Sequence, residues 1–239
     1  VDEETSTMLA SSVSICGVSA AIATCGVIRG DNKKLSYIIS LVLVCAVPMM
    51  YLMPWLAGLL LPTVLSNPET VQEVAGAWMG GTIDTTGAVV ASGALLGETA
   101  EQTAIIVKSS QNVLLGIAAF VISLYWSYKG QNKRQRPSVR VIWERFPKFV
   151  VGFVAVSLLF SLFFAGSEAA PARTSAKMFS NTLFSIAFVC IGLETRFRDI
   201  FSKENRRTFW AFMTAQMFNI VVTLIVAYLL VGVLKPYLN

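Results

Sequence analysis

The segment that most constrains the fold is residues 78–96, WMGGTIDTTGAVVASGALL, which is apolar enough for a membrane but contains residues that a plain membrane helix avoids. It holds a carboxylate at Asp84 and four glycines. A carboxylate at the bilayer centre costs about 2.5–3.5 kcal/mol on insertion scales, and a glycine inside a helix costs about 1 kcal/mol relative to alanine. We therefore expect this segment to be broken and to have a function.

Composition places the whole chain in a membrane. Of its 239 residues, 55% are hydrophobic and only 14% are charged, with a mean hydropathy of +0.65. A bilayer-spanning helix needs about 20 apolar residues, and the chain has several such runs joined by short polar connectors. These features predict an all-α membrane protein, a polytopic helical bundle forming one transmembrane domain over residues 1–239. Because the chain begins at Val1 and not at Met, we expect it to be the later part of a longer protein.

The charged and metal-binding residue types narrow the function. The net charge of +5 comes from positive residues in the connectors, which indicates membrane topology and not a nucleic-acid partner. The four cysteines lie in apolar runs without a CxxC pair, and the chain has no histidine. We expect no metal site and no cofactor, and, with the commonest general base missing, no enzyme.

Seven apolar segments are expected in the membrane, of which the first and third are broken. They cover residues 5–28, 35–61, 71–97, 104–128, 149–165, 178–193 and 208–234.

The positive-inside rule constrains the third segment. If residues 71–97 crossed the membrane once, the connector at 129–148, with seven Lys and Arg residues, would face outward while the basic connector at 29–34 faced inward. A segment that enters and returns on the same side removes this conflict and also places the basic connector at 196–207 inside. Backbone that is not helical at this depth must lie against protein or a water-filled cavity, so a re-entrant hairpin indicates a pathway.

A short internal repeat relates the two broken segments. Residues 14–21 align with residues 84–91, matching at Gly17 with Gly87 and at Ala21 with Ala91. Since one firm crossing separates them, they should enter from opposite faces, as in transporters built from inverted repeats.

The same stretches resemble a known family. SICGVSAAIA at 14–23, GGTIDTTGAVVASGA at 80–94, FPKFVVGF at 146–153 and IGLETRF at 191–197 are similar to the YeiH family of proposed sulfate exporters. The resemblance implies a multi-pass protein of the bacterial inner membrane, with the architecture of an inverted-repeat transporter. This chain has Ile83 before Asp84 where members often have histidine, and Gln111 after Lys108 where they often have arginine.

Asp84 is the strongest single candidate residue. Its carboxylate could bind Na⁺ together with the hydroxyls of Thr82, Thr85 and Thr86, or it could carry a proton. The alternative is a structural role as the N-cap of a half-helix that starts near Thr85.

Two further groups could bind an anion. Ser14, Cys16, Gly17 and Ser19 could offer hydroxyls and free N–H groups to an oxyanion at a half-helix N-terminus, or could simply allow close packing. The substrate site would lie between these residues on one side and Thr82, Thr85, Thr86 and Gly87 on the other. Lys108 could attract an anion or balance the charge of Asp84, or it could extend its amine to the membrane interface. Asn112, one turn deeper, could bind substrate or make a hydrogen bond between helices.

We thus expect an ion-coupled secondary transporter, exporter or exchanger, of a small inorganic or organic anion such as sulfate or a sulfonate. The coupling ion would be Na⁺ or H⁺, acting through Asp84. An uncoupled channel and a membrane sensor or partner subunit are the alternatives. The lipid bilayer is the expected environment, and assembly into a homo-oligomer stays open.

Overall fold

The computed structural model describes residues 1–129 and 205–235, with scattered residues between 152 and 193. All regular secondary structure in the described residues is helical, as the sequence predicts. The expected segments 149–165 and 178–193 lie outside the continuously described residues. Three of the described helices are long and apolar enough to cross a membrane.

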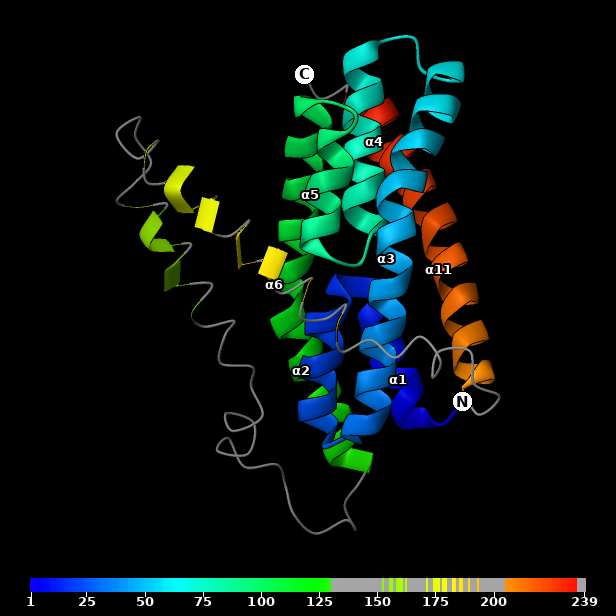
Figure 1. Cartoon of the computed structure of the whole chain (residues 1–239), viewed down its shortest axis with the longest axis vertical. Coiled ribbons are helices and arrows are strands. Elements are labelled where there is room, and N and C mark those ends of the chain that lie inside the picture. The colour runs from blue at the N-terminus through cyan, green and yellow to red at the C-terminus, as the bar shows by residue number, and fades with distance from the viewer. Residues whose placement is uncertain are drawn as a thin grey trace.

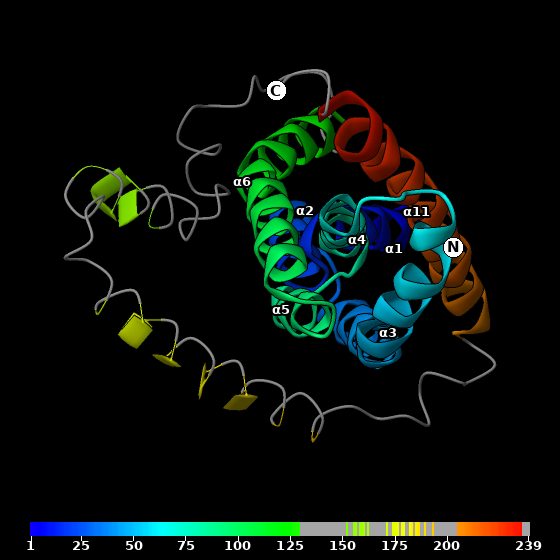
Figure 2. The ribbon, with the colours of Figure 1, turned by 90° about the horizontal axis from the view of Figure 1, so that it is seen from above.

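These three long helices lie on the outside of the bundle (Figure 2). They are α3 (Asn32–Leu60), which a 3₁₀ turn at Leu61–Thr63 extends, α6 (Glu98–Lys129) and α11 (Arg206–Ala227), which continues as a π-helix over Tyr228–Leu234. At 1.5 Å per residue, the 29 residues of α3 extend about 44 Å, more than the ~30 Å hydrocarbon core of a bilayer.

The first apolar segment is a helical hairpin and does not cross the bundle (Figure 1). Helix α1 (Glu3–Ser11) continues as a π-helix (Ser12–Cys16), the chain reverses at Gly17, and α2 (Val18–Ile28) returns to the end where α1 began. Gly17 has a φ of +58°, a backbone angle that residues other than glycine rarely adopt. The 11 residues of α2 extend only about 17 Å, half of a bilayer core.

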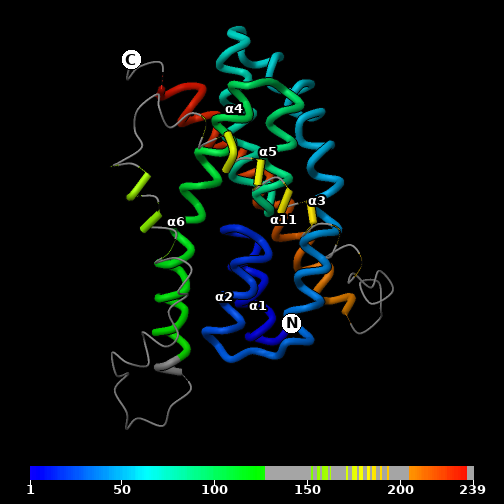
Figure 3. The backbone as a smooth tube through the Cα atoms, turned by 60° about the vertical axis from the view of Figure 1, so that its left-hand side comes forward, coloured from blue at the N-terminus to red at the C-terminus, as the bar shows by residue number. Residues whose placement is uncertain are grey.

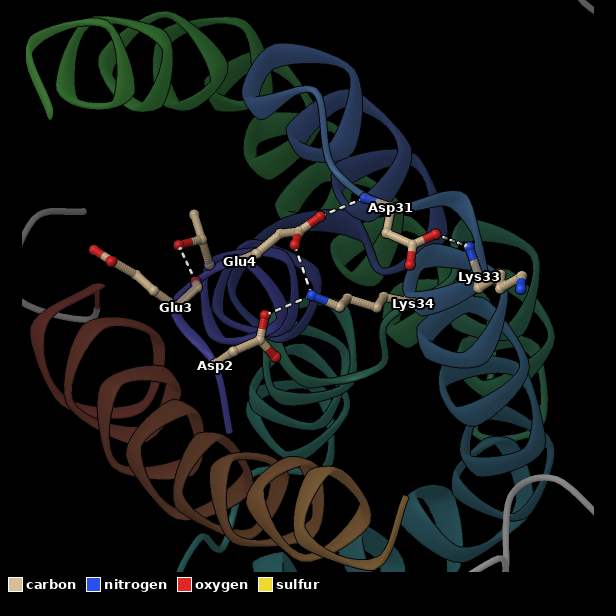
Figure 4. A network of polar contacts seen from close by, with 7 residues as sticks. Asp2, Glu3, Glu4, Asp31, Lys33 and Lys34 are labelled. Atoms are coloured by element: carbon tan, nitrogen blue, oxygen red, sulfur yellow. Dashed lines mark hydrogen bonds and ion pairs between the residues drawn. The ribbon is translucent and has the colours of Figure 1, made fainter. Parts of the chain in front are cut away.

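Charged residues close the base of this first hairpin (Figure 4). Lys34 Nζ lies 2.7 Å from Asp2 Oδ2 and 2.7 Å from Glu4 Oε2. The other Glu4 oxygen accepts the backbone N–H of Asp31, which in turn caps α3 by accepting Lys33 N–H at 2.8 Å. The beginning of α1 is thereby tied to the turn between α2 and α3.

The second broken segment is also a hairpin, and it enters from the other end of the bundle (Figures 1 and 3). Helix α4 (Pro68–Thr82) runs inward, three residues break the helix, and α5 (Thr86–Ala94) returns. The 15 residues of α4 extend about 22 Å, too short to cross a bilayer core. The prediction of a segment that enters and returns is therefore confirmed.

Small residues bring α4 and α6 into close contact. A Cβ added at Gly80 would lie 2.6 Å from the carbonyl oxygen of Ala104, and one at Gly76 would overlap the backbone at Ala100. The GxxxG spacing at these two glycines thus serves helix packing. On the other side of α4, buried Trp78 donates its indole N–H to Ile220 O of α11 at 2.9 Å.

The ends of the long helices agree with the predicted topology. Tyr125 Oη, near the end of α6, lies 3.3 Å from Glu3 Oε1, and Tyr37 Oη of α3 lies 3.3 Å from Asn205 O, just before α11. The described ends next to all three basic connectors therefore gather at the base of the first hairpin. At the opposite end, Lys235 pairs with Glu73 at 2.6 Å.

Candidate functional site

The tips of the two hairpins touch near the middle of the bundle (Figure 3). A Cβ added at Gly17, the tip of the first hairpin, would lie 2.9 Å from Asp84 Cβ and 3.1 Å from Asp84 O, in the break of the second. It would also lie 2.9 Å from Val42 Cγ1 of α3. Only glycine allows this approach, so the two breaks that the sequence aligns are brought together in space.

The inward helix of each hairpin ends at its tip, where its last carbonyls have no partner within the helix. In the first hairpin, two of these carbonyls accept hydrogen bonds from side chains of the long helices. Lys108 Nζ of α6 donates to Ile15 O at 2.8 Å, and Asn219 Nδ2 of α11 donates to Val13 O at 3.3 Å.

The second hairpin is held by the same two long helices. Gln111 Nε2 of α6 donates to Gly81 O at 3.2 Å, and Gln216 Nε2 of α11 donates to Thr82 O at 3.1 Å. The polar residues of α6 and α11 thus support both breaks, which explains their presence in apolar helices.

The returning helices α2 and α5 begin at the same place, so their N–H ends also meet there. Their N-cap residues, Gly17 and Thr85, make no side-chain capping hydrogen bond. The N–H groups of a helix's first turn have no intrahelical partner and carry partial positive charge, which favours an anion. Thr86 and Gly87 occupy the first turn of α5 and are half-buried.

Asp84 is fully enclosed within the described structure, with a relative exposure of 1%, and its Oδ2 has no hydrogen-bond partner there. The N-cap position of α5 is taken by Thr85, so the structural alternative of Asp84 as that cap is wrong. Burial of an unpaired carboxylate is costly, so this residue is typical of a functional site.

Lys108 is equally buried, at 1% exposure, and its ammonium group points inward to Ile15 O and to Gln111 Oε1 at 3.1 Å. The alternative that its amine extends to the membrane interface is therefore wrong. Within the described residues, Lys108 and Asp84 do not form an ion pair. The centre of the bundle thus holds one cationic and one anionic side chain that interact electrostatically without forming an ion pair.

The remaining candidates divide by exposure. Cys16 and Gly17 are buried in the tip of the first hairpin, whereas Ser14 and Ser19 are exposed on the surface of the described part of the chain. Thr82 is buried, and Asn112 is half-buried with an unpartnered Oδ1.

Sequence reasoning missed Gln216 and Asn219. Two amides three residues apart fall on one face of α11, and this was the available signal in an otherwise apolar helix. Gln216 is 3% exposed and contacts the second hairpin, while Asn219 contacts the first.

The fold and site define a helical integral membrane protein with two broken segments that meet between its long helices. Residues 1–211 match the family described as Conserved hypothetical protein 698, so the chain belongs to this family. This confirms the resemblance to YeiH-type proteins seen in the sequence.

Relatives of the chain are described as UPF0324 membrane proteins. One from Rhodopirellula baltica is 38% identical over 93% of this chain and 41% of its own length. One from Nitratidesulfovibrio vulgaris is 37% identical over 96% of this chain and 40% of its own length, and one from Nitrosomonas europaea is 30% identical over 82% and 44%. The chain thus spans about two-fifths of the length of these relatives. No solved structure matches it.

Proposed function

We propose that this protein is a secondary active transporter of a small anion in the bacterial inner membrane. The observation that carries the proposal is the meeting of two half-length hairpins, from opposite ends of the bundle, at Gly17 and Asp84. Secondary transporters with inverted repeats place their binding sites where such broken helices meet, near the bilayer midplane. A protein of purely structural role has no need to bury this polar centre.

The charge distribution favours an anionic substrate. The N-terminal ends of α2 and α5 converge on the tips, and their N-cap residues, Gly17 and Thr85, make no side-chain capping hydrogen bond. Lys108 adds a full positive charge beside the first hairpin. Free N–H groups and an ammonium group together suit an oxyanion such as sulfate or a sulfonate.

Asp84 supplies the coupling in this proposal. A buried carboxylate without an ion-pair partner is stabilised by taking up a cation or a proton. Binding of that ion would compensate the carboxylate beside the anion site, so that ion and anion are bound together. Alternating access would follow from movement of the bundle that holds the tips relative to the rest of the protein.

The experiment that tests this function is anion binding to the purified full-length protein. Sulfate, sulfite, small sulfonates and dicarboxylates are titrated with and without Na⁺ and across pH, for the wild type and Asp84→Asn. Glu69→Gln, an exposed carboxylate in the same hairpin, is the matched control. We expect saturable binding that requires Na⁺ or a proton and disappears only in Asp84→Asn. Absence of binding to every anion by a folded protein would refute the proposal.

A further inference from the structure

We propose that the break between α4 and α5 binds a monovalent cation, with the side-chain oxygens of Thr82, Asp84, Thr85 and Gln216 as its ligands. The role of this cation as a coupling ion rests on the proposed function, whereas the binding site itself follows from the buried oxygens of the break. Of the two expected coupling ions, Na⁺ and H⁺, such a site favours Na⁺.

The break between α4 and α5 holds a cluster of buried oxygens without hydrogen-bond partners. Thr82 Oγ1, Asp84 Oδ2 and Thr85 Oγ1 are all buried, and none of the three accepts or donates a hydrogen bond in the described structure. They lie within four consecutive residues at a helix break. Buried polar atoms are almost always paired, so three orphans in one turn indicate a ligand that all of them contact.

Gln216 brings a fourth oxygen from a different helix. Its Nε2 donates to Thr82 O at 3.1 Å and contacts Met49 Sδ at 3.3 Å, which fixes the amide group beside the break. Its Oε1, bonded to the same carbon, is buried and has no partner. Because the amide nitrogen donates to a carbonyl, the amide oxygen remains available as an acceptor. A cation binds to acceptor atoms of this kind and needs no donor.

The charge of the cluster selects a monovalent ion. Asp84 is its one carboxylate, and the other ligands are neutral hydroxyl and amide oxygens. Sites for Ca²⁺ or Mg²⁺ usually combine several carboxylates or retain several waters. Within the described residues, no group of three His, Cys, Asp or Glu side chains could hold a metal ion. A single positive charge would neutralise the site.

The cation nearest to Asp84 does not bind its carboxylate. Lys108, from α6, interacts electrostatically with Asp84, but its ammonium group is hydrogen-bonded to Ile15 O and Gln111 Oε1. The other titratable neighbours of Asp84 are the thiols of Cys16, at the tip of the first hairpin, and Cys45, on α3. Asp84 is thus the group whose charge the bound ion would balance.

The test is direct binding of radioactive sodium to the purified full-length protein, without substrate anion and at constant ionic strength in choline gluconate. We expect saturable binding that Asp84→Asn abolishes. Removal of one neutral ligand in Gln216→Leu or Thr85→Val should weaken it about fivefold to tenfold. Thr214→Val and Gln102→Leu, exposed on α11 and α6, are the matched controls and should bind as the wild type does.

The wild type alone provides a second measurement that does not depend on a variant folding. Na⁺, but not choline, should raise its unfolding temperature, because a ligand that binds only the folded state stabilises it. Absence of both saturable sodium binding and this shift would overturn the inference.

Two outcomes separate this inference from the proposed function. Anion flux driven by a proton gradient in Na⁺-free vesicles, with no sodium binding, would overturn the cation site and leave the transporter intact. Sodium binding that Asp84→Asn abolishes, in a protein that neither binds nor moves any anion, would support the site and refute the transporter.

Discussion

Replacement of Gly17 by alanine tests the contact between the two hairpin tips. The residue has φ +58° and ψ −108°, a conformation that costs a side-chain-bearing residue about 1–3 kcal/mol. The new methyl group would also lie 2.9 Å from both Asp84 Cβ and Val42 Cγ1, and such overpacking costs about 1–3 kcal/mol. Alanine also reduces the conformational freedom of the unfolded chain, which offsets about 0.4–1 kcal/mol of this cost. We therefore expect a net loss of about 2–5 kcal/mol in the free energy of unfolding.

The assay is the free energy of unfolding of the purified full-length protein, measured by denaturant titration in detergent micelles. Gly26→Ala is the matched control, because Gly26 lies in α2 with no atom within 4 Å of an added Cβ. The Gly26→Ala variant should be as stable as the wild type or more stable by up to about 1 kcal/mol, because alanine favours the helix over glycine by about that amount. If Gly17→Ala is as stable as Gly26→Ala, the tips do not meet as described.

Three further perturbations test other contacts. Gly80→Ala should lose about 1–3 kcal/mol of unfolding free energy, because its methyl group meets the α6 backbone, whereas Gly58→Ala, which meets no atom, should not. Lys108→Met should abolish anion binding in a binding titration. It should also lower the free energy of unfolding by about 1–3 kcal/mol in an unfolding titration, because the Ile15 carbonyl of the first hairpin loses its donor. The hydrogen bond from Lys34 lowers the pKa of Asp2 to about 2 from 3.8. The stability difference between the wild type and Asp2→Asn should therefore be constant above about pH 5 and disappear as the pH falls towards 2, with a pH-independent difference refuting that contact.

The sequence predicted much of the architecture, because hydropathy and charge act along the chain. The long helices α3, α6 and α11 follow from apolar runs that each border a basic connector at one end, and the re-entrant α4–α5 hairpin follows from the positive-inside rule. The close contact of Gly17 with the Asp84 break agrees with the short repeat that aligned the two segments.

The sequence could not reveal which side chains converge from distant helices. Asp84 and Lys108 were singled out because charge is rare in a membrane, but only the packing shows that Lys108 binds Ile15 O and not the carboxylate. Gln216 and Asn219 carry no charge, and although their spacing places both on one face of α11, that spacing does not show that they support the breaks. The exposure of Ser14 and Ser19 likewise depends on how the first hairpin packs.

The proposed ion-coupled anion site at the meeting point of the hairpin tips is best tested by measuring anion flux. The full-length protein is reconstituted in vesicles, and uptake of radioactive sulfate is followed with and without a Na⁺ or proton gradient, for the wild type, Asp84→Asn and Glu69→Gln. Other radioactive oxyanions follow if sulfate is not bound. We predict saturable uptake that a gradient drives, that Glu69→Gln retains and that Asp84→Asn loses. Uptake that does not saturate, or that is equal in Asp84→Asn, would contradict the account.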